Sequence, residues 1–223
     1  MAPFRLAPRL QRLLPWSSSA QYWERRYARG GNSGKGSYGD LAAFKAEFLN
    51  AFVAEHDIAT VIEFGCGDGA QLSLAHYPRY LGFDVSDTAL NVCRAKFAGD
   101  ASKSFQRAGD YAGEQAALAL SLDVVFHLLE DHTFAVYMRR LFFAAERFVV
   151  IYSSDFDESA APKARHVRHR KFSAWAARHA PEFAEVSRLD NPYRERPPGV
   201  GLPTTQSIFA VYARIAPRQP QAW

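Results

Sequence analysis

Residues Thr60–Leu72 read TVIEFGCGDGAQL, and this stretch decides the fold of the 223-residue chain. It opens with β-branched and aromatic residues, which favour a buried strand. Three glycines then follow at alternate positions, Gly65, Gly67 and Gly69. Glycine tolerates positive φ angles and lets a ligand lie against bare backbone. The pattern therefore predicts a strand that ends in a ligand-binding turn.

Two carboxylates frame this turn. Glu63 stands just before the first glycine, and Asp84 ends a second apolar stretch, Tyr80–Val85 (YLGFDV). The sequence between them predicts a helix over Gln71–His76. A strand, a glycine turn, a helix and a second strand tipped by an acid form a nucleoside-binding βαβ unit. A carboxylate at that tip has two oxygens for the two hydroxyls of a ribose.

Two kinds of nucleoside fit this unit. Gly65, Gly67 and Ala70 match the dinucleotide fingerprint G-x-G-x-x-G/A, and an acid follows about 20 residues later. However, Glu63 and Asp68 bring negative charge to the turn where a pyrophosphate would lie. A cationic ligand without phosphate suits the turn better. S-adenosylmethionine (SAM), an adenosine with a sulfonium and an amino-acid tail, is such a ligand.

The run Glu63–Gly69 (EFGCGDG) resembles the E/D-x-G-x-G-x-G motif of class I SAM-dependent methyltransferases, and Asp84 resembles that family's acid at the end of the second strand. The resemblance covers roughly residues 22–215. It implies an α/β fold with a Rossmann-like, doubly wound sheet of seven strands, mostly parallel with an antiparallel last strand. It also implies SAM as cofactor. The candidate cofactor-binding residues are Glu63, Gly65, Cys66, Gly67, Gly69, Asp84, Val85, Asp110, Tyr111, Phe126, Tyr22, Trp23 and Tyr38.

Apolar stretches alternate with helical patterns along the rest of the chain. Besides the two strands above, we expect strands over Ser104–Ala108, Leu122–His127, Arg147–Ser153, Phe183–Leu189 and Ser207–Ile215. The predicted helices besides Gln71–His76 cover Ala20–Arg29, Leu41–Glu55, Thr88–Phe97, Thr133–Leu141 and Phe172–His179. This alternation indicates a parallel sheet wound on both faces.

The length suits one domain, which we place at 20–216 between a leader (1–19) and a tail (217–223). Residues 20–58 are expected to supply a helical lid, because the glycine-rich loop Gly30–Gly39 directly precedes the cofactor unit. A flexible connector is the alternative. Prolines interrupt the apolar residues of the leader, so it has no signal-peptide core. It either packs on the domain or touches a membrane surface or a partner.

Composition excludes several classes of protein. A net charge of +4 and a pI near 9.1 are too modest to imply nucleic acid, and no Lys/Arg run forms a nucleic-acid tail. The two cysteines form no CxxC pattern, so we expect no disulfide framework, no metal site and a cytoplasmic location. No apolar run reaches the ~18 residues that a membrane span needs.

His127 and His132 are the candidate catalytic bases. Both follow the predicted fourth strand, whose carboxyl end faces the ligand crevice of a parallel sheet. An imidazole with a pKa of about 6.5 can take a proton from a hydroxyl at neutral pH. A hydrogen bond to the loop backbone is the alternative role. The N/D-P-P-Y/F signature of some family members is absent, which favours an oxygen acceptor.

A basic stretch precedes the helix Phe172–His179, where the helix dipole opposes cations. An anionic acceptor such as a phosphate or a sugar acid would explain it, and a solvated loop is the alternative. A long Pro- and Gly-rich loop, Asn191–Thr205, is a second candidate for acceptor contacts. The candidate acceptor-binding residues of the two segments are His166, Arg168, His169, Arg170, Tyr193 and Arg194.

The sequence therefore predicts a SAM-dependent methyltransferase that modifies a hydroxyl or other oxygen of a small polar acceptor, of anionic or sugar type. Tyr22–Glu24 (YWE) and Phe126–Asp131 (FHLLED) resemble small bacterial methyltransferases of surface-polysaccharide or other secondary biosynthesis. An NAD-linked oxidoreductase and a non-catalytic SAM-binding protein are the competing interpretations. No nucleic-acid partner is expected, and the sequence leaves the oligomeric state open.

Overall fold

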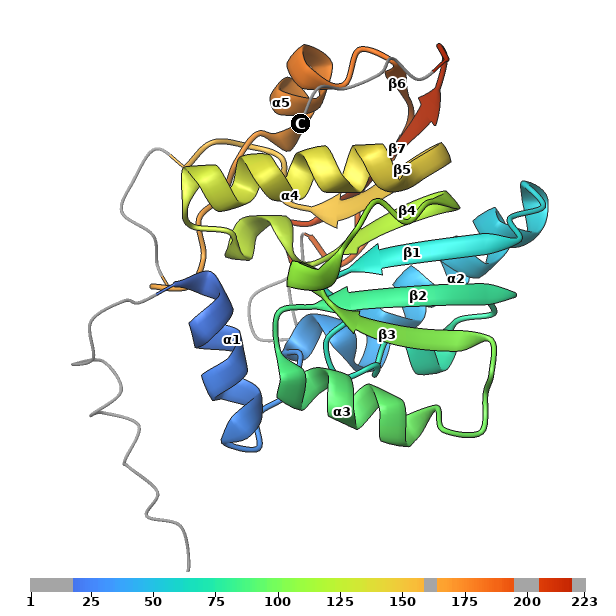
Figure 1. The fold of residues 1–223 in the computed structure, drawn as a ribbon. Coiled ribbons are helices and arrows are strands. Elements are labelled where there is room, and N and C mark those ends of the chain that lie inside the picture. The colour runs from blue at the N-terminus through green and yellow to red at the C-terminus, as the bar shows by residue number, and fades with distance from the viewer. Residues whose placement is uncertain (1–17, 159–163, 195–204, 218–223) are drawn as a thin grey trace, which may run out of the picture.

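The computed structural model describes residues 18–158, 164–194 and 205–217. These residues include a seven-stranded sheet of order β3-β2-β1-β4-β5-β7-β6 (Figure 1). The first five strands are parallel, and β7 runs antiparallel to both β5 and β6. This confirms the predicted doubly wound, mostly parallel sheet. The strands are β1 Thr60–Phe64, β2 Arg79–Asp84, β3 Lys103–Arg107, β4 Ala116–Leu122, β5 Ala145–Ser153, β6 Phe183–Leu189 and β7 Ile208–Arg214.

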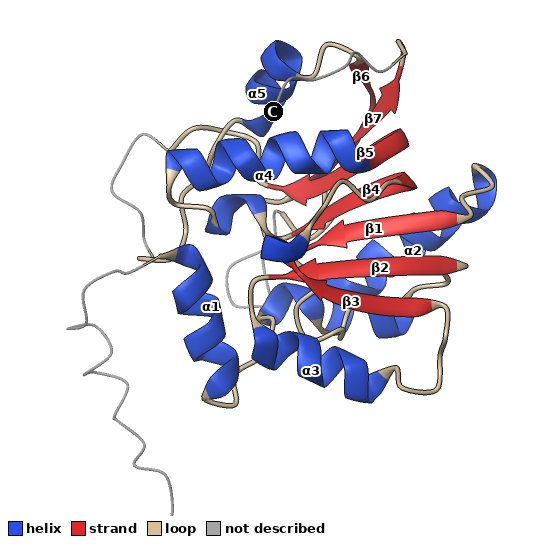
Figure 2. Ribbon diagram, in the orientation of Figure 1, coloured by secondary structure: helices blue, strands red, loops and turns tan. Residues whose placement is uncertain are grey.

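Helices cover both faces of the sheet (Figure 2). Their buried side chains place α4 and α5 over one face and α2 and α3 over the other. None of the helices in the described part of the chain has the length and apolar content needed to cross a membrane. The helices are α1 Ser19–Ala28, α2 Gly39–Glu55, α3 Asp87–Lys96, α4 Asp131–Ala144 and α5 Phe172–His179.

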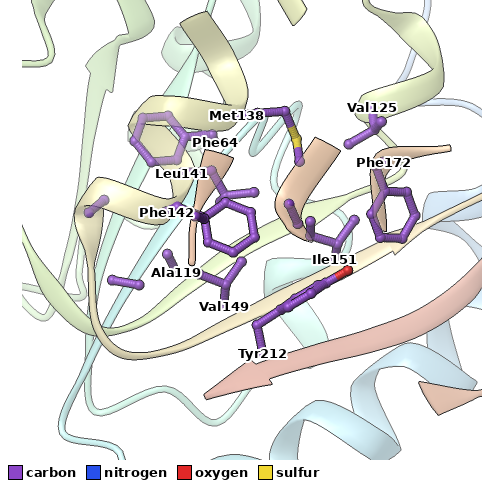
Figure 3. Close-up of a cluster of buried hydrophobic side chains, with 14 of the residues drawn as sticks. Phe64, Ala119, Val125, Met138, Leu141, Phe142, Val149, Ile151, Phe172 and Tyr212 are labelled. Atoms are coloured by element: carbon purple, nitrogen blue, oxygen red, sulfur yellow. The ribbon is translucent and has the colours of Figure 1, made fainter. Parts of the chain in front are cut away.

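The core under α4 shows why this helix forms where the sequence predicts it. Phe134, Met138, Leu141 and Phe142 recur at three- and four-residue spacing and are all buried. They pack against side chains of β4, β5 and β7, among them Tyr212 (Figure 3). The apolar stripe of the helix therefore fixes its orientation on the sheet.

The prediction that the fourth strand spans Leu122–His127 is wrong. The strand β4 spans Ala116–Leu122, and Val125–His127 form a 3-10 turn beyond its end. Alanine and leucine dominate β4 (AALALSL), and both residue types favour helices in isolation. Every residue of β4 is buried, so packing between two helical layers overrides that local preference. His127 consequently lies on a turn and not on a strand.

The predicted helix over Gln71–His76 is also wrong. Only a short 3-10 helix, Leu72–Leu74, forms there, and the backbone is extended at Ala75. Pro78 has no N–H and disfavours a helical conformation of the residue before it, so a longer helix would have little room before β2. The N–H of His76 instead donates to Oδ1 of Asn50 at 2.8 Å.

Some predictions fall outside the described residues. The predicted leader lies there up to residue 17, as do positions 218–223 of the predicted tail. Positions 195–204 of the predicted acceptor loop are also outside the description. The division of the chain into leader, domain and tail stays a prediction.

We expect Leu141→Ala to lower the free energy of unfolding by about 2–5 kcal/mol, because Leu141 is fully buried and its loss leaves a cavity. Leu189→Ala makes the same chemical change at an exposed position of β6 and should cost less than about 1 kcal/mol. Urea denaturation followed by circular dichroism measures both values. Equal losses would contradict the assignment of the core to the α4 face.

Candidate active site

A cavity of about 300 Å³ lies at the carboxyl ends of β1, β2 and β4. The strand order reverses here, since β2 and β4 lie on opposite sides of β1, and such switch points are where open α/β sheets bind ligands. The glycine turn, the end of β2, the β4–α4 connection and the helices α1, α2 and α4 supply its walls. The predicted site residues that line it are Trp23, Glu63, Gly65, Cys66, Gly67, Asp84, Val85, His127 and His132.

The glycine turn packs too closely to admit side chains. Gly65 and Gly67 have φ angles of +90° and +57°, which other residues rarely adopt. A Cβ atom on Gly65 would lie 2.4 Å from Cγ2 of Val124, and one on Gly67 would lie 2.3 Å from Oγ of Ser33. The third glycine, Gly69, lies outside the cavity lining and packs against α3.

Asp84 is buried beneath this turn. Its Oδ2 accepts a hydrogen bond from the N–H of Gly67 at 2.9 Å, and its Oδ1 accepts one from the N–H of Ser86 at 2.9 Å. Burial raises the pKa of Asp84 to about 6, although the backbone donors favour the charged form. The tip of β2 is therefore joined to the turn after β1 by a carboxylate that faces the cavity.

Glu63 is the second buried acid of the site. The hydroxyl of Tyr80 donates to its Oε2 at 2.6 Å. Burial raises the pKa of Glu63 to about 7, against the opposing effects of Tyr80 and of the ammonium group of Lys45. The carboxyl group is consequently poised between its two protonation states near neutral pH, and a bound cation would favour the charged state.

Asp68 joins the glycine turn after β1 to the glycine-rich loop that precedes α2. Its Oδ2 accepts hydrogen bonds from the N–H of Ser33 at 3.1 Å and from the hydroxyl of Tyr38 at 2.7 Å. Burial opposes ionisation, yet these hydrogen bonds hold the pKa of Asp68 below its usual value. Tyr38, a predicted cofactor residue, thus contacts the turn and not the cavity.

Helix α1 is attached by hydrogen bonds to the starts of both α3 and α4. Ser19 donates from its N–H and its hydroxyl to the carboxylate of Glu130, at 3.1 and 2.8 Å. Five residues later, Glu24 accepts a hydrogen bond from the hydroxyl of Thr88 at 2.5 Å. Between these two anchors, Trp23 turns its ring into the cavity lining.

His127 lies in a stack of rings beside Trp23. Its Nδ1 is 2.8 Å from the carbonyl oxygen of His166, and a carbonyl only accepts, so Nδ1 carries the proton and Nε2 is left as an acceptor. The His166 ring lies parallel to His127 at 5.4 Å and to Tyr22 at 4.8 Å. Burial lowers the pKa of His127 to about 4, so the ring is neutral at physiological pH.

Other predicted residues near this stack are less enclosed. His132 lines the cavity from the first turn of α4, where it is exposed. Phe126 packs edge-on to His127 at 4.5 Å and lies outside the lining. Asp110 is exposed after β3, and Tyr111 packs edge-on against Phe64 at 5.2 Å. Neither of these last two lines the cavity.

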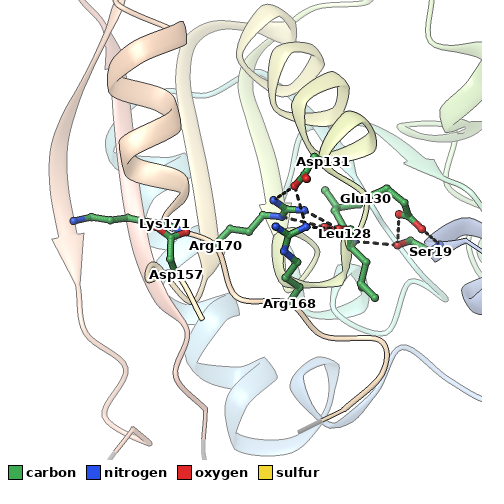
Figure 4. Close-up of polar contacts among 9 residues, drawn as sticks. Ser19, Leu128, Glu130, Asp131, Asp157, Arg168, Arg170 and Lys171 are labelled. Atoms are coloured by element: carbon green, nitrogen blue, oxygen red, sulfur yellow. Dashed lines mark hydrogen bonds and ion pairs between the residues drawn. The ribbon is translucent and has the colours of Figure 1, made fainter. Parts of the chain in front are cut away.

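The basic segment predicted to bind an anion is engaged with the start of α4 (Figure 4). Arg168 and Arg170 both pair with Asp131, at 2.9 and 2.6 Å. They also donate to the carbonyl oxygen of Leu129 at 2.9 and 2.7 Å. His169 shares a 2.6 Å hydrogen bond between its Nδ1 and the hydroxyl of the buried Ser154. These side chains hold the β5–α5 connection in place beside the cavity.

The two candidates from the long loop lie elsewhere. The Tyr193 ring is 6.3 Å from Phe44 of α2, on the face of the sheet opposite α4. Arg194 pairs with Asp190 at 3.2 Å. The structure therefore does not bring Tyr193 and Arg194 together with His166, and none of the three belongs to the described cavity lining.

Sequence analysis missed a buried ion pair in the cavity wall. Lys45 of α2 is 1% exposed, and its ammonium nitrogen is 2.5 Å from Oδ2 of Asp123. A signal was present, because Lys45 lies four residues after Leu41 and four before Leu49, on the buried stripe of its helix. Asp123 carried no comparable signal, since its position depends on where β4 ends.

Among the described residues no group of three or more His, Cys, Asp or Glu side chains is placed to hold a metal ion. Cys66 and Cys93 are both buried, and the hydrogen bond between the two thiols together with burial raises the pKa of the Cys66 thiol. The thiol of Cys93 points to the carbonyl oxygen of Gly67 at 3.1 Å. The cysteines therefore fill space behind the glycine turn.

Comparison with solved structures identifies proteins of the same fold. The N-methyltransferase NodS from Bradyrhizobium japonicum WM9, in complex with S-adenosyl-L-homocysteine, matches 90% of this chain and 100% of its own with a TM-score of 0.68 and 16% identity. Magnesium protoporphyrin IX methyltransferase (ChlM) from Synechocystis PCC 6803 with bound SAM matches 90% and 99%, with a TM-score of 0.63 and 15% identity.

A SAM-dependent methyltransferase from Anabaena variabilis ATCC 29413 matches 90% of this chain and 96% of its own, with a TM-score of 0.62 and 16% identity. No protein-family model and no curated protein sequence matches the chain. The shared architecture at such low identity shows that this chain has the methyltransferase fold.

Glu63→Gln should change how stability depends on pH. Glu63 has a pKa of about 7 in the folded protein and about 4.5 in the unfolded chain. The folded protein therefore binds this proton more tightly, which stabilises the fold at low pH. That stabilisation is lost as the pH rises from 4.5 through 7. Between pH 5.5 and pH 8 the free energy of unfolding of the wild type should fall by about 2 kcal/mol more than that of the variant.

Urea denaturation at the two pH values measures this difference. Glu55→Gln, at an exposed position of α2, is the matched control and should follow the wild type. A parallel pH response of Glu63→Gln and wild type would show that Glu63 ionises normally in the folded protein.

Proposed function

We propose that this protein is a SAM-dependent methyltransferase that modifies an oxygen atom of a small polar acceptor. One observation carries the proposal: two buried acids, Glu63 and Asp84, flank a glycine turn whose backbone faces a cavity at the switch point of a methyltransferase fold. The similar structures include proteins solved with SAM or S-adenosylhomocysteine.

The residues of the cavity suit this cofactor. A sulfonium and an ammonium group are cations, and they would favour the charged form of Glu63, whose pKa lies near neutrality. The carboxylate of Asp84 can accept hydrogen bonds from both ribose hydroxyls. When bound, SAM supplies a methyl group on a sulfur that is already a good leaving group, so positioning provides much of the rate.

His127 is the proposed general base. Its Nδ1–H is fixed by the carbonyl of His166, which aims the lone pair of Nε2 as the proton acceptor. The proton of the acceptor hydroxyl moves to Nε2, and the oxygen becomes the nucleophile. Because burial keeps the ring neutral, this base stays available as pH falls toward 5. His132 of α4 is the second candidate, since it also lines the cavity.

The segment from α1 to α2 is the proposed lid. It is attached through Glu130 to the start of α4, through Thr88 to the start of α3, and through Asp68 to the glycine turn. A closed lid excludes water, which strengthens electrostatic interactions inside the cavity. The exposed Asp110 and the neighbouring Tyr111 are the proposed adenine contacts, next to the cavity wall at Ala108.

The acceptor is proposed to be a polar molecule with a hydroxyl group. Arg168 and Arg170 both pair with Asp131. The proposal of a hydroxyl acceptor therefore rests on His127 and not on these two cations. An anionic or sugar-type acceptor stays a prediction that a panel of hydroxyl compounds tests.

Calorimetric titration tests the cofactor. We expect micromolar binding of SAM and S-adenosylhomocysteine, and roughly a 10- to 100-fold loss in Asp84→Asn, because a carboxamide cannot accept hydrogen bonds with both of its polar atoms. Asp100→Asn, at an exposed turn, is the control and should bind as the wild type does. Binding of NAD alone would make the protein a dinucleotide enzyme instead.

Turnover tests the base. His127→Ala should lower the release of S-adenosylhomocysteine by at least roughly 100-fold without changing SAM affinity, with a hexose, a uronic acid and a phenol as trial acceptors. His179→Ala, on the exposed side of α5, should keep full turnover. Unchanged turnover in His127→Ala would remove this residue from the mechanism. SAM binding with no turnover on any acceptor would favour a non-catalytic SAM-binding protein.

A further inference from the structure

Arg170 has no part in the function proposed above, yet its side chain is packed beside the proposed base. It belongs to the β5–α5 connection, two residues before α5 begins at Phe172. Only 11% of its side chain is exposed, against 45% for Arg168. Its guanidinium carbon lies 4.7 Å from the centre of the Phe134 ring, which is itself buried under α4. Arg170 is therefore held against the body of the protein.

Three donor atoms of Arg170 reach the chain directly after His127. Its Nε donates to the carbonyl oxygen of Leu128 at 3.2 Å, and its Nη2 donates to that of Leu129 at 2.7 Å. Its Nη1 pairs with Asp131 at 2.6 Å (Figure 4). A guanidinium group presents these donors in a rigid planar fork, so the three bonds fix the relative positions of their acceptors.

The ion pair with Asp131 does not explain why Arg170 lies here. Asp131 is 75% exposed, and ion pairs at such positions contribute at most about 1 kcal/mol. Asp131 is also the first residue of α4, and the dipole of a helix opposes a cation at its N-terminus. The bonds to the two backbone carbonyls are therefore the contacts that favour an enclosed arginine at this place.

The β4–α4 and β5–α5 connections are bonded to each other in both directions. His127 donates from its Nδ1 to the carbonyl of His166 at 2.8 Å. Four residues after His166, Arg170 donates back to the carbonyls of the two residues that follow His127. Between these contacts the N–H of Arg168 donates to the carbonyl of Phe126 at 2.8 Å. The position of the His166 carbonyl beside the His127 ring thus depends on how firmly the two connections are joined.

The His166 carbonyl decides which nitrogen of His127 can take a proton. The ring is neutral at physiological pH, because burial lowers its pKa to about 4. A neutral imidazole carries one N–H, on either nitrogen. A carbonyl fixed at Nδ1 keeps the proton there and leaves Nε2 as an acceptor. If that carbonyl moves away, the ring can adopt the other tautomer, in which Nε2 already carries a proton.

We propose that Arg170 is a positioning residue for the methyl transfer: its guanidinium group joins the two connections so that the His166 carbonyl holds the proton of His127 on Nδ1. This inference rests on the proposed function, in which Nε2 of His127 takes the proton of the acceptor hydroxyl. It gives Arg170 a role different from anion binding, because the residue acts through His127 and touches neither ligand.

Nitrogen NMR of isotope-labelled histidine rings tests this role without any ligand. In the wild type at pH 8, His127 should show the Nδ1–H tautomer alone, and its signal is the one that His127→Ala removes. Arg170→Gln and Arg170→Lys should both give a mixture of the two tautomers, because glutamine lacks the charge and the fork and lysine lacks the fork. Arg188→Gln is the matched control: it removes another arginine that pairs with an acid of the β5–α5 connection, Asp155 at 2.8 Å. It should keep the wild-type tautomer.

Turnover separates a positioning role from a binding role. Both Arg170 variants should lower kcat at least roughly tenfold, with the KM for the acceptor and the affinity for SAM unchanged. Arg188→Gln should keep the wild-type kcat. A higher KM for the acceptor, with kcat and the tautomer unchanged, would make Arg170 an acceptor-binding residue and overturn the proposal.

Two further results would contradict the role of Arg170. One is a wild-type His127 with its proton on Nε2, which needs no variant and is therefore independent of any folding defect. The other is an Arg170 variant that keeps both the wild-type circular dichroism spectrum and the Nδ1–H tautomer. If the variants give the mixture but the wild type turns over no acceptor, the proposed function fails while the control of His127 by Arg170 stands.

Discussion

The hydrogen bond from the N–H of Gly67 to the carboxylate of Asp84 joins the two strands on which the site depends. It connects the turn after β1 to the tip of β2, so the glycine backbone and the acid face one cavity. The acid is buried there, and its pKa is raised accordingly. Neighbouring segments then pack onto this turn, with Ser33 on one side and Val124 on the other, at distances that only glycine permits.

Carboxylates also attach the segment 19–55 to the rest of the protein. Asp68, Glu130 and Glu24 each hold a hydrogen bond between the segment 19–55 and the body of the protein. The same segment contributes Trp23 and Lys45 to the cavity wall. Hydrogen bonds to charged groups are stronger than hydrogen bonds between neutral groups, so these three contacts fix the position of the segment beside the cavity.

The environment of His127 illustrates how neighbours determine chemistry. A carbonyl at Nδ1 sets its tautomer, and burial keeps the ring neutral. The rings of Trp23 and His166 lie beside His127. Trp23 comes about 100 residues before His127 in the chain, and His166 about 40 residues after it. Two basic residues near His166, Arg168 and Arg170, pair with Asp131 at the start of α4, and their role in binding an acceptor stays a prediction.

The sequence by itself determined the parallel sheet, the glycine turn and the acid of Asp84, since these follow from local patterns: apolar runs, glycines at alternate positions and an acid at a strand end. Tertiary structure alone decided the limits of β4, because its alanines and leucines favour a helix until two layers of helices bury them. It also decided that Lys45 meets Asp123, 78 residues away, and that Gln71 keeps a buried oxygen without a donor among the described residues. Such contacts join residues that no local pattern connects, and burial acts on their charges only after the chain has folded around them.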